Sequence, residues 1–203
     1  MNNNPLLILV TIAGGMYLAW LWWGDWRAAE AGRPNPGALP GAVGAPLRAC
    51  VVAAVGALVL TGAETWGELR LGLSAEQSKM TVLFGVYSLV AAVVEEVIFR
   101  GFIVVEGRGK AARLAGAVAA SVVFAGLHPF LWEWDGGLRL VWTAKGLFST
   151  GAVLAASLWF YAMRFSARLN PKGSLLPCFA AHGAKNVAVI AIKAAQGFVT
   201  GWW

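Results

Sequence analysis

Charged side chains are scarce in this chain: Asp, Glu, Lys and Arg make up 13% of its 203 residues, whereas 59% are hydrophobic. A soluble domain carries roughly a quarter charged residues, so the composition excludes an ordinary soluble globular protein. Cysteine is also rare, and Cys50 and Cys178, the two present, do not suggest a disulfide framework or a thiolate metal site. No run interleaves basic and aromatic residues, so we expect no nucleic-acid partner despite the net charge of +6. The chain is predicted to be an integral membrane protein in contact with a lipid bilayer.

Long apolar runs take the place of the missing charge. A helix needs about 20 largely apolar residues to cross the hydrocarbon core of a bilayer. The sequence therefore predicts an all-α polytopic membrane protein with about six transmembrane helices, at residues 5–23, 46–63, 81–105, 112–132, 140–163 and 176–199. We expect one integral membrane domain, in which residues 1–80 supply two spans and an interfacial segment and residues 81–203 form the main helix bundle.

The connections between these spans carry most of the charge. Residues 64–80 contain five charged side chains and are predicted to lie on the membrane surface. Loops one, three and five contain nine Lys and Arg, and loops two and four contain three. The positive-inside rule therefore predicts that both termini lie outside. The membrane is expected to be the cytoplasmic membrane of a prokaryote.

Four ionisable residues stand out because they fall inside the apolar spans. They are both histidines of the chain, His128 and His182, and the adjacent acids Glu95 and Glu96. Such groups are costly in hydrocarbon, so they usually face a polar cavity, a partner or a substrate. Their placement indicates chemistry within the bilayer.

The two acids are expected to differ in role. Successive helical residues point about 100° apart, so Glu95 and Glu96 cannot share a face. Glu96 stacks over Arg100 one turn later, and this pair is either only a buried ion pair or part of a site. Glu95 has no partner in its own helix and could act as a general base.

Each histidine has a polar or aromatic neighbour one helical turn away. His128 follows Phe124 and precedes Pro129, which disturbs a helix and can open room for water. His182 and Asn186 could donate hydrogen bonds to a developing oxyanion, or they could form an interhelical polar clamp. The predicted spans put His128 on the order of 10–15 Å from the depth of Glu95 and His182. We expect these groups to converge, which requires that the fourth helix is displaced, is tilted or starts earlier, or that the predicted span boundaries are wrong.

Three lysines also lie within the predicted spans. Lys145 and Lys193 are near span ends and are expected to extend their ammonium groups toward water. Lys185 is deeper, and it could pair with a carboxylate or line an entrance.

Three short motifs together resemble one known family. The motifs EEVIFR at 95–100, FAGLH at 124–128 and HGAKN at 182–186 are similar to those of the CAAX protease and bacteriocin-processing enzyme family, also called the CPBP or ABI family, which includes Rce1-like prenyl proteases. Each motif alone is a weak signal, but the three occur in the family's order and use every histidine of the chain. The resemblance covers roughly residues 81–195.

This resemblance implies a glutamate-dependent intramembrane endopeptidase that needs no cofactor. By motif position, Glu95 is the implied base that activates water with the help of His128, and His182 and Asn186 are the implied oxyanion stabilisers. Glu96 and Arg100 are implied supporting residues. The implied substrate is a membrane-anchored protein or peptide cleaved near the membrane interface, and residues 81–203 would be the catalytic bundle.

Two other functions are open at this point. Glu95, His128 and His182 could instead bind Zn²⁺ with water in the fourth position, as in a metalloprotease. Alternatively, the polar centre could serve a non-enzymatic membrane protein, such as a transporter, a scaffold or an immunity protein that binds a peptide.

Overall fold

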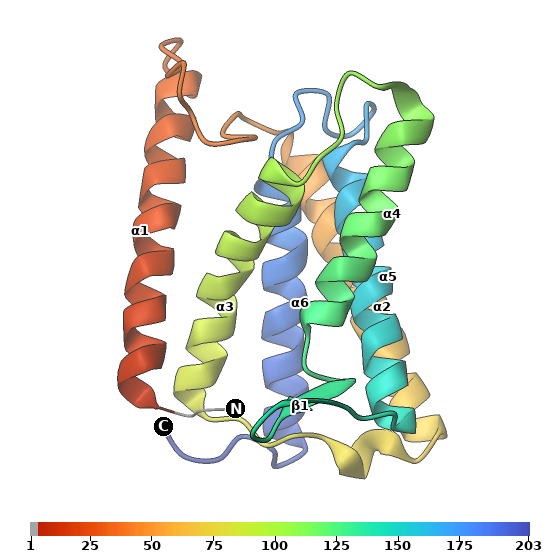
Figure 1. Cartoon of the computed structure of the whole chain (residues 1–203). Helices are drawn as coiled ribbons and strands as arrows, with labels where there is room; N and C mark the ends of the chain where they lie inside the picture. The colour runs from red at the N-terminus through yellow and green to blue at the C-terminus, as the bar shows by residue number, and fades with distance from the viewer. Residues whose placement is uncertain (1–3) are drawn as a thin grey trace.

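A computed structural model describes residues 4–203 as a bundle of long helices with one small hairpin (Figure 1). Residues 1–3, part of the predicted N-terminal region, lie outside the described residues. The elements are α1 (Pro5–Glu30), α2 (Leu47–Arg70), η1 (Leu73–Glu76), α3 (Val82–Glu96), η2 (Val97–Phe102), α4 (Gly109–Leu127), β1 (Trp132–Trp134), β2 (Leu138–Leu140), α5 (Ala144–Arg164) and α6 (Leu176–Ala195).

The helices confirm an all-α, multi-pass membrane protein. Within residues 4–203, five helices are long and apolar enough to cross a membrane: α1, α2, α3 continued by η2, α4 and α5. The sixth predicted span is α6, a 20-residue helix with several polar side chains. It lies in the middle of the bundle and contacts α2, α3 and α5 (Figure 1). Its polar side chains therefore face protein.

Small residues allow the central helices to approach closely. Ala49, Ala53 and Ala57 form a fully buried stripe on α2, which packs against α5 and α6. The Trp159 indole of α5 lies over this stripe and donates a hydrogen bond of 2.9 Å to the Ala53 carbonyl. Small residues at helix contacts are common in membranes, where close backbone approach supplies much of the attraction.

The ends of the bundle differ in the connections they hold. The α1–α2, α3–α4 and α5–α6 connections lie at one end (Figure 1). The α2–α3 connection, the hairpin between α4 and α5, and the C-terminal residues lie at the other end. The Met80 amide donates to the Phe198 carbonyl and the Leu83 amide to the Trp202 carbonyl. These bonds fix the chain's end beside the start of α3.

The predicted interfacial segment at residues 64–80 is wrong for its first part. Helix α2 continues to Arg70 and keeps Glu64 and Glu68 on its inner side. These acids bind Lys185 and Lys145 of neighbouring helices. A charged side chain that is paired within a helix bundle can lie away from the membrane surface. The prediction from charge alone therefore ended this helix too early. Helix α1 likewise extends beyond the predicted residue 23 to Glu30.

The helix at the predicted fourth span begins and ends earlier than expected. Helix α4 begins at Gly109 and ends at Leu127, and His128 has the extended backbone angles φ −73° and ψ 132°. Pro129 explains this ending, because the residue before a proline is sterically disfavoured from helical geometry. The chain then forms the β1–β2 hairpin, most of which lies in the connection predicted between the fourth and fifth spans.

Candidate active site

A buried carboxylate joins two of the predicted site helices. Glu96 and Arg100 are fully buried, and Glu96 Oε1 lies 3.0 Å from Arg100 Nη1. The same oxygen lies 2.8 Å from Nδ1 of His182 on α6. Because a carboxylate accepts hydrogen bonds, His182 Nδ1 is the donor in this contact. The Glu96–Arg100 pair, anticipated from helical spacing, therefore also orients a histidine from another helix.

Arg100 is enclosed by aromatic rings. Its guanidinium carbon lies 4.6 Å from the centroid of the Phe124 ring, 4.9 Å from that of Tyr161 and 5.2 Å from that of Phe160. Ring faces attract cations, more strongly where water is excluded. Arg100 Nη2 also donates to Ser157 Oγ at 2.5 Å, and Ser157 donates to Ser121 at 2.9 Å. Sequence reasoning missed this surrounding, because it is built from α4 and α5.

A widened turn follows the two acids. Residues 97–102 form the π-helical η2, which leaves backbone carbonyls without their usual α-helical partners. The Tyr161 hydroxyl lies 2.5 Å from the Phe99 carbonyl, and Arg164 Nε donates to the Arg100 carbonyl at 2.9 Å. Side chains of α5 thus stabilise the irregular backbone just after Glu95 and Glu96.

Glu95 is placed differently from its neighbour. Its side chain is 33% exposed, and its Oε2 atom lies 3.7 Å from His182 Nε2. The His182 imidazole therefore lies between two carboxylates, with Nδ1 toward Glu96 and Nε2 toward Glu95. Glu95 is therefore partly exposed, whereas Glu96 is buried with its Oε1 atom bound to Arg100 and His182 and its Oε2 atom without a partner.

His128 approaches the same region from the end of α4. Its Nδ1 atom lies 2.8 Å from the Phe124 carbonyl. A carbonyl can only accept, so Nδ1 carries a proton, and in the neutral imidazole the lone pair is on Nε2. The Phe124 ring lies between the two histidines, with its centroid 4.8 Å from that of His128 and 6.2 Å from that of His182.

A cavity of about 270 Å³ brings three predicted site residues together. His128, His182 and Asn186 all line it, with residues of α2, α5 and the segment before α3. The Asn186 amide donates to the Ser88 carbonyl of α3 at 2.9 Å, which leaves its second N–H hydrogen for another acceptor. Glu95 does not line this cavity and approaches it at the His182 ring.

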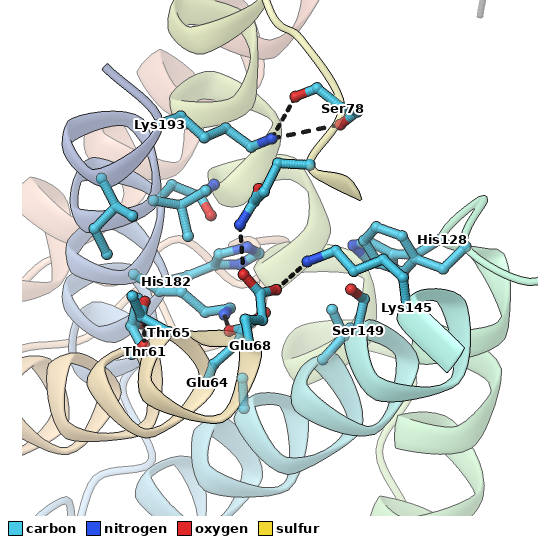
Figure 2. A pocket seen from close by; sticks show the side chains of 18 of the residues that line it. Thr61, Glu64, Thr65, Glu68, Ser78, His128, Lys145, Ser149, His182 and Lys193 are labelled. Carbon is cyan, nitrogen blue, oxygen red and sulfur yellow. Dashed lines mark hydrogen bonds and ion pairs between the residues drawn. The ribbon is translucent and has the colours of Figure 1, made fainter. Parts of the chain in front are cut away.

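The cavity also contains charged residues that sequence reasoning did not assign to the site. Glu64 accepts from Lys185 at 2.6 Å, and Glu68 accepts from both Lys145 and Gln77 (Figure 2). Lys185 therefore pairs with a carboxylate, which is one of the two possibilities that the sequence left open for it. Lys145 does not extend to water as predicted, because its ammonium group binds Glu68.

The ammonium group of Lys193, which was also predicted to extend toward water, donates to the Ser78 carbonyl at 2.6 Å in an exposed hydrogen bond. The sequence did contain a signal for the polar residues of α2 that line the cavity. Thr61, Glu64, Thr65 and Glu68 follow helical spacing and continue one face of the second span.

The zinc hypothesis receives no geometric support. Among residues 4–203, no three His, Cys, Asp or Glu side chains are grouped so that they could hold a metal ion. Glu95 and His182 are close, but His128 does not join them in such a group. A catalytic zinc site needs three protein ligands, so this donor set does not fit the ion.

Comparison with protein families gives a specific match. Residues 77–188 match the model of the Rce1-like family, described as type II CAAX prenyl endopeptidase Rce1-like. The match covers more than half of the chain and contains all three motifs, from α3 into α6. Searches of curated proteins and of solved structures gave no match. The chain belongs to the Rce1-like family, and it is a multi-pass membrane protease of that family.

Proposed function

We propose that the protein is a glutamate-dependent intramembrane endopeptidase in which Glu95 activates the hydrolytic water. The observation that carries this proposal is the position of His182, whose two ring nitrogens face Glu96 at 2.8 Å and Glu95 at 3.7 Å beside a cavity. Glu96 is committed to Arg100 and His182. Glu95 is the carboxylate left to accept a proton.

In the proposed reaction, Glu95 accepts a proton from water as the water oxygen attacks the scissile carbonyl carbon. His128 assists through Nε2, which holds the lone pair of the neutral ring when Nδ1 donates to the Phe124 carbonyl. The peptide C–N bond then breaks, and the departing amine takes up the proton held by Glu95. Proton transfer of this kind contributes roughly 10²–10⁴-fold to a rate.

His182 and Asn186 are proposed to stabilise the oxyanion. They lie one turn apart on α6 and line the same cavity. The second amide hydrogen of Asn186 is one donor, and His182 Nε2–H, when the ring is protonated, is the other. Donors fixed in place before the reaction stabilise developing charge without reorganisation. Arg100 and Glu96 act as positioning residues, since they hold His182 through Nδ1.

The proposed substrate is a membrane-anchored protein or peptide cleaved near the membrane interface. The cavity is lined by helices of the bundle, several of which are long and apolar enough to cross a membrane, and this supports a substrate that is itself held in the membrane. We propose that residues 81–203 form the catalytic bundle, to which α2 adds the cavity wall of Glu64 and Glu68. The lysine and arginine distribution supports an orientation with both termini outside the cytoplasmic membrane.

The test compares membrane proteomes of cells that express the wild type, Glu95→Gln or Glu106→Gln. We expect an uncleaved membrane protein to accumulate with Glu95→Gln, because the amide cannot accept the proton from water. Glu106 is an exposed acid after η2 and outside the cavity, so Glu106→Gln should match the wild type. Equal membrane proteomes for all three, at equal amounts of folded protein, would favour a non-enzymatic scaffold or immunity function.

A further inference from the structure

We propose that the β1–β2 hairpin is a docking surface for the bilayer interface, and that this contact fixes the cavity wall that carries His128. The docking itself is independent of the peptidase function. Its consequence for His128 rests on that proposed function.

The hairpin has one apolar and one charged face. Its register pairs Trp132 with Leu140, Trp134 with Leu138, and Glu133 with Arg139. Directly paired residues of antiparallel strands point to the same side, and successive residues alternate between sides. The two tryptophan–leucine pairs therefore share one face, and the Glu133–Arg139 pair lies on the other.

The apolar face is uncovered by protein. Trp134 is 75% exposed, Leu138 63% and Leu140 64%. On the opposite face the charged side chains are paired with one another, because Arg139 lies 3.8 Å from Glu133 and 4.0 Å from Asp135. A short two-stranded hairpin is at best marginally stable alone in water, so its apolar face needs a surface to lie on.

The position of the hairpin in the bundle indicates that this surface is the membrane. Helix α4 ends well before the lower ends of α3 and α6, and the hairpin lies below its end (Figure 1). Leu127 at the end of α4 and Trp142 and Leu147 around the start of α5 are apolar and exposed as well. Tryptophan is enriched where membrane meets water. Trp202 is exposed too, and it lies beside the start of α3, because its carbonyl accepts from the Leu83 amide.

The hairpin is tied to the candidate active site by short contacts. The Trp132 indole donates to the Gly126 carbonyl at 2.9 Å, which fastens β1 to the last turn of α4. Between them, Phe130 lines the cavity, stacks on the His128 ring at 5.9 Å and donates its backbone amide to the His128 carbonyl at 2.8 Å. A shift of the hairpin would therefore move His128.

Site-directed fluorescence tests the docking. Leu138→Cys and Arg139→Cys, each in a Cys50→Ala background that leaves only the buried Cys178, are labelled with an environment-sensitive nitrobenzoxadiazole dye. The proteins are reconstituted in vesicles of phosphatidylcholine and phosphatidylglycerol. At 138 we expect emission at shorter wavelength, strong quenching by nitroxide-labelled lipid and weak quenching by iodide, and at 139 the reverse. Equal quenching at both positions, or dominant iodide quenching at 138, would overturn the docking.

The link to His128 is tested by cleavage of the membrane protein that accumulates with Glu95→Gln. The double variant Trp134→Ser/Leu138→Ser should cleave it more slowly, whereas Glu133→Gln/Arg139→Gln, which keeps the apolar face, should cleave it at the wild-type rate. Thermal unfolding of both double variants checks that the bundle is intact. Unchanged cleavage by the serine variant would overturn the link. If the wild type cleaves nothing, the peptidase function fails while the fluorescence result still decides the docking.

Discussion

At the scale of single residues, the contrast between Glu95 and Glu96 organises the site. Glu96 is fully buried and its Oε1 atom serves both Arg100 and His182, whereas Glu95 is one-third exposed and meets only the far side of the His182 ring. Adjacent residues in a helix face different surroundings. One acid therefore supports the structure, and the other is left for the proposed chemistry.

This contrast predicts that the two acids differ in how much they contribute to stability. Glu96→Ala leaves the buried Arg100 guanidinium without its carboxylate, and breaking a buried pair in this way costs about 3–5 kcal/mol. Glu95→Gln removes only a 3.7 Å contact of a partly exposed group, so its free energy of unfolding should stay close to that of the wild type. Unfolding of purified protein in detergent micelles measures both. Equal stability of the two variants would contradict the assigned role of Glu96.

At the scale of elements, close helix contact depends on where small residues lie. A Cβ atom added at Gly56 of α2 would lie 2.3 Å from the Trp159 ring of α5, whereas one added at Gly62 meets nothing within 4 Å. These glycines belong to the same helix. They therefore separate the effect of packing from that of helix propensity.

Gly56→Ala should destabilise the bundle by about 1–3 kcal/mol, because the added methyl group forces the rigid indole away from α2. Gly62→Ala should be neutral or stabilising by up to about 1 kcal/mol, because alanine favours helix over glycine. Thermal unfolding of the two variants gives the comparison. A Gly56→Ala protein as stable as Gly62→Ala would show that α2 and α5 are not this close.

At the scale of the whole molecule, alternating helices put the basic connections at one end of the bundle and the hairpin and C-terminal residues at the other (Figure 1). The three connections at the basic end hold most of the loop Lys and Arg residues. Because the two ends carry different connections, labelling a residue at each end can show which end faces the cytoplasm.

Cysteine accessibility in intact cells tests that orientation. Lys172→Cys lies in the α5–α6 connection and Arg139→Cys in the hairpin, at opposite ends of the bundle. A membrane-impermeant maleimide should label Arg139→Cys from outside and reach Lys172→Cys only after the cells are opened. The inverse result would reverse the proposed orientation, and labelling of both from outside would contradict a membrane-spanning α5.

Much of this architecture followed from local sequence. Apolar runs near the length of a membrane span predicted the helices, and residues four apart predicted the Glu96–Arg100 pair, because both features depend on neighbours along the chain. The end of α2 and the surroundings of Arg100 could not be predicted in this way. Glu64 and Glu68 stay in the helix because Lys185 and Lys145 come from other helices, and Ser157 and Tyr161 reach η2 from α5.

The sequence by itself determined that this protein is a helical membrane protein, which ionisable groups lie among its spans, and which family its three motifs resemble. Only the tertiary structure decided that His182 lies between the two glutamates and that His128 shares a cavity with His182. Hydropathy and helical spacing act over a few turns of one helix. The depth and direction of a side chain at the site depend on how several helices pack together, which no single segment encodes.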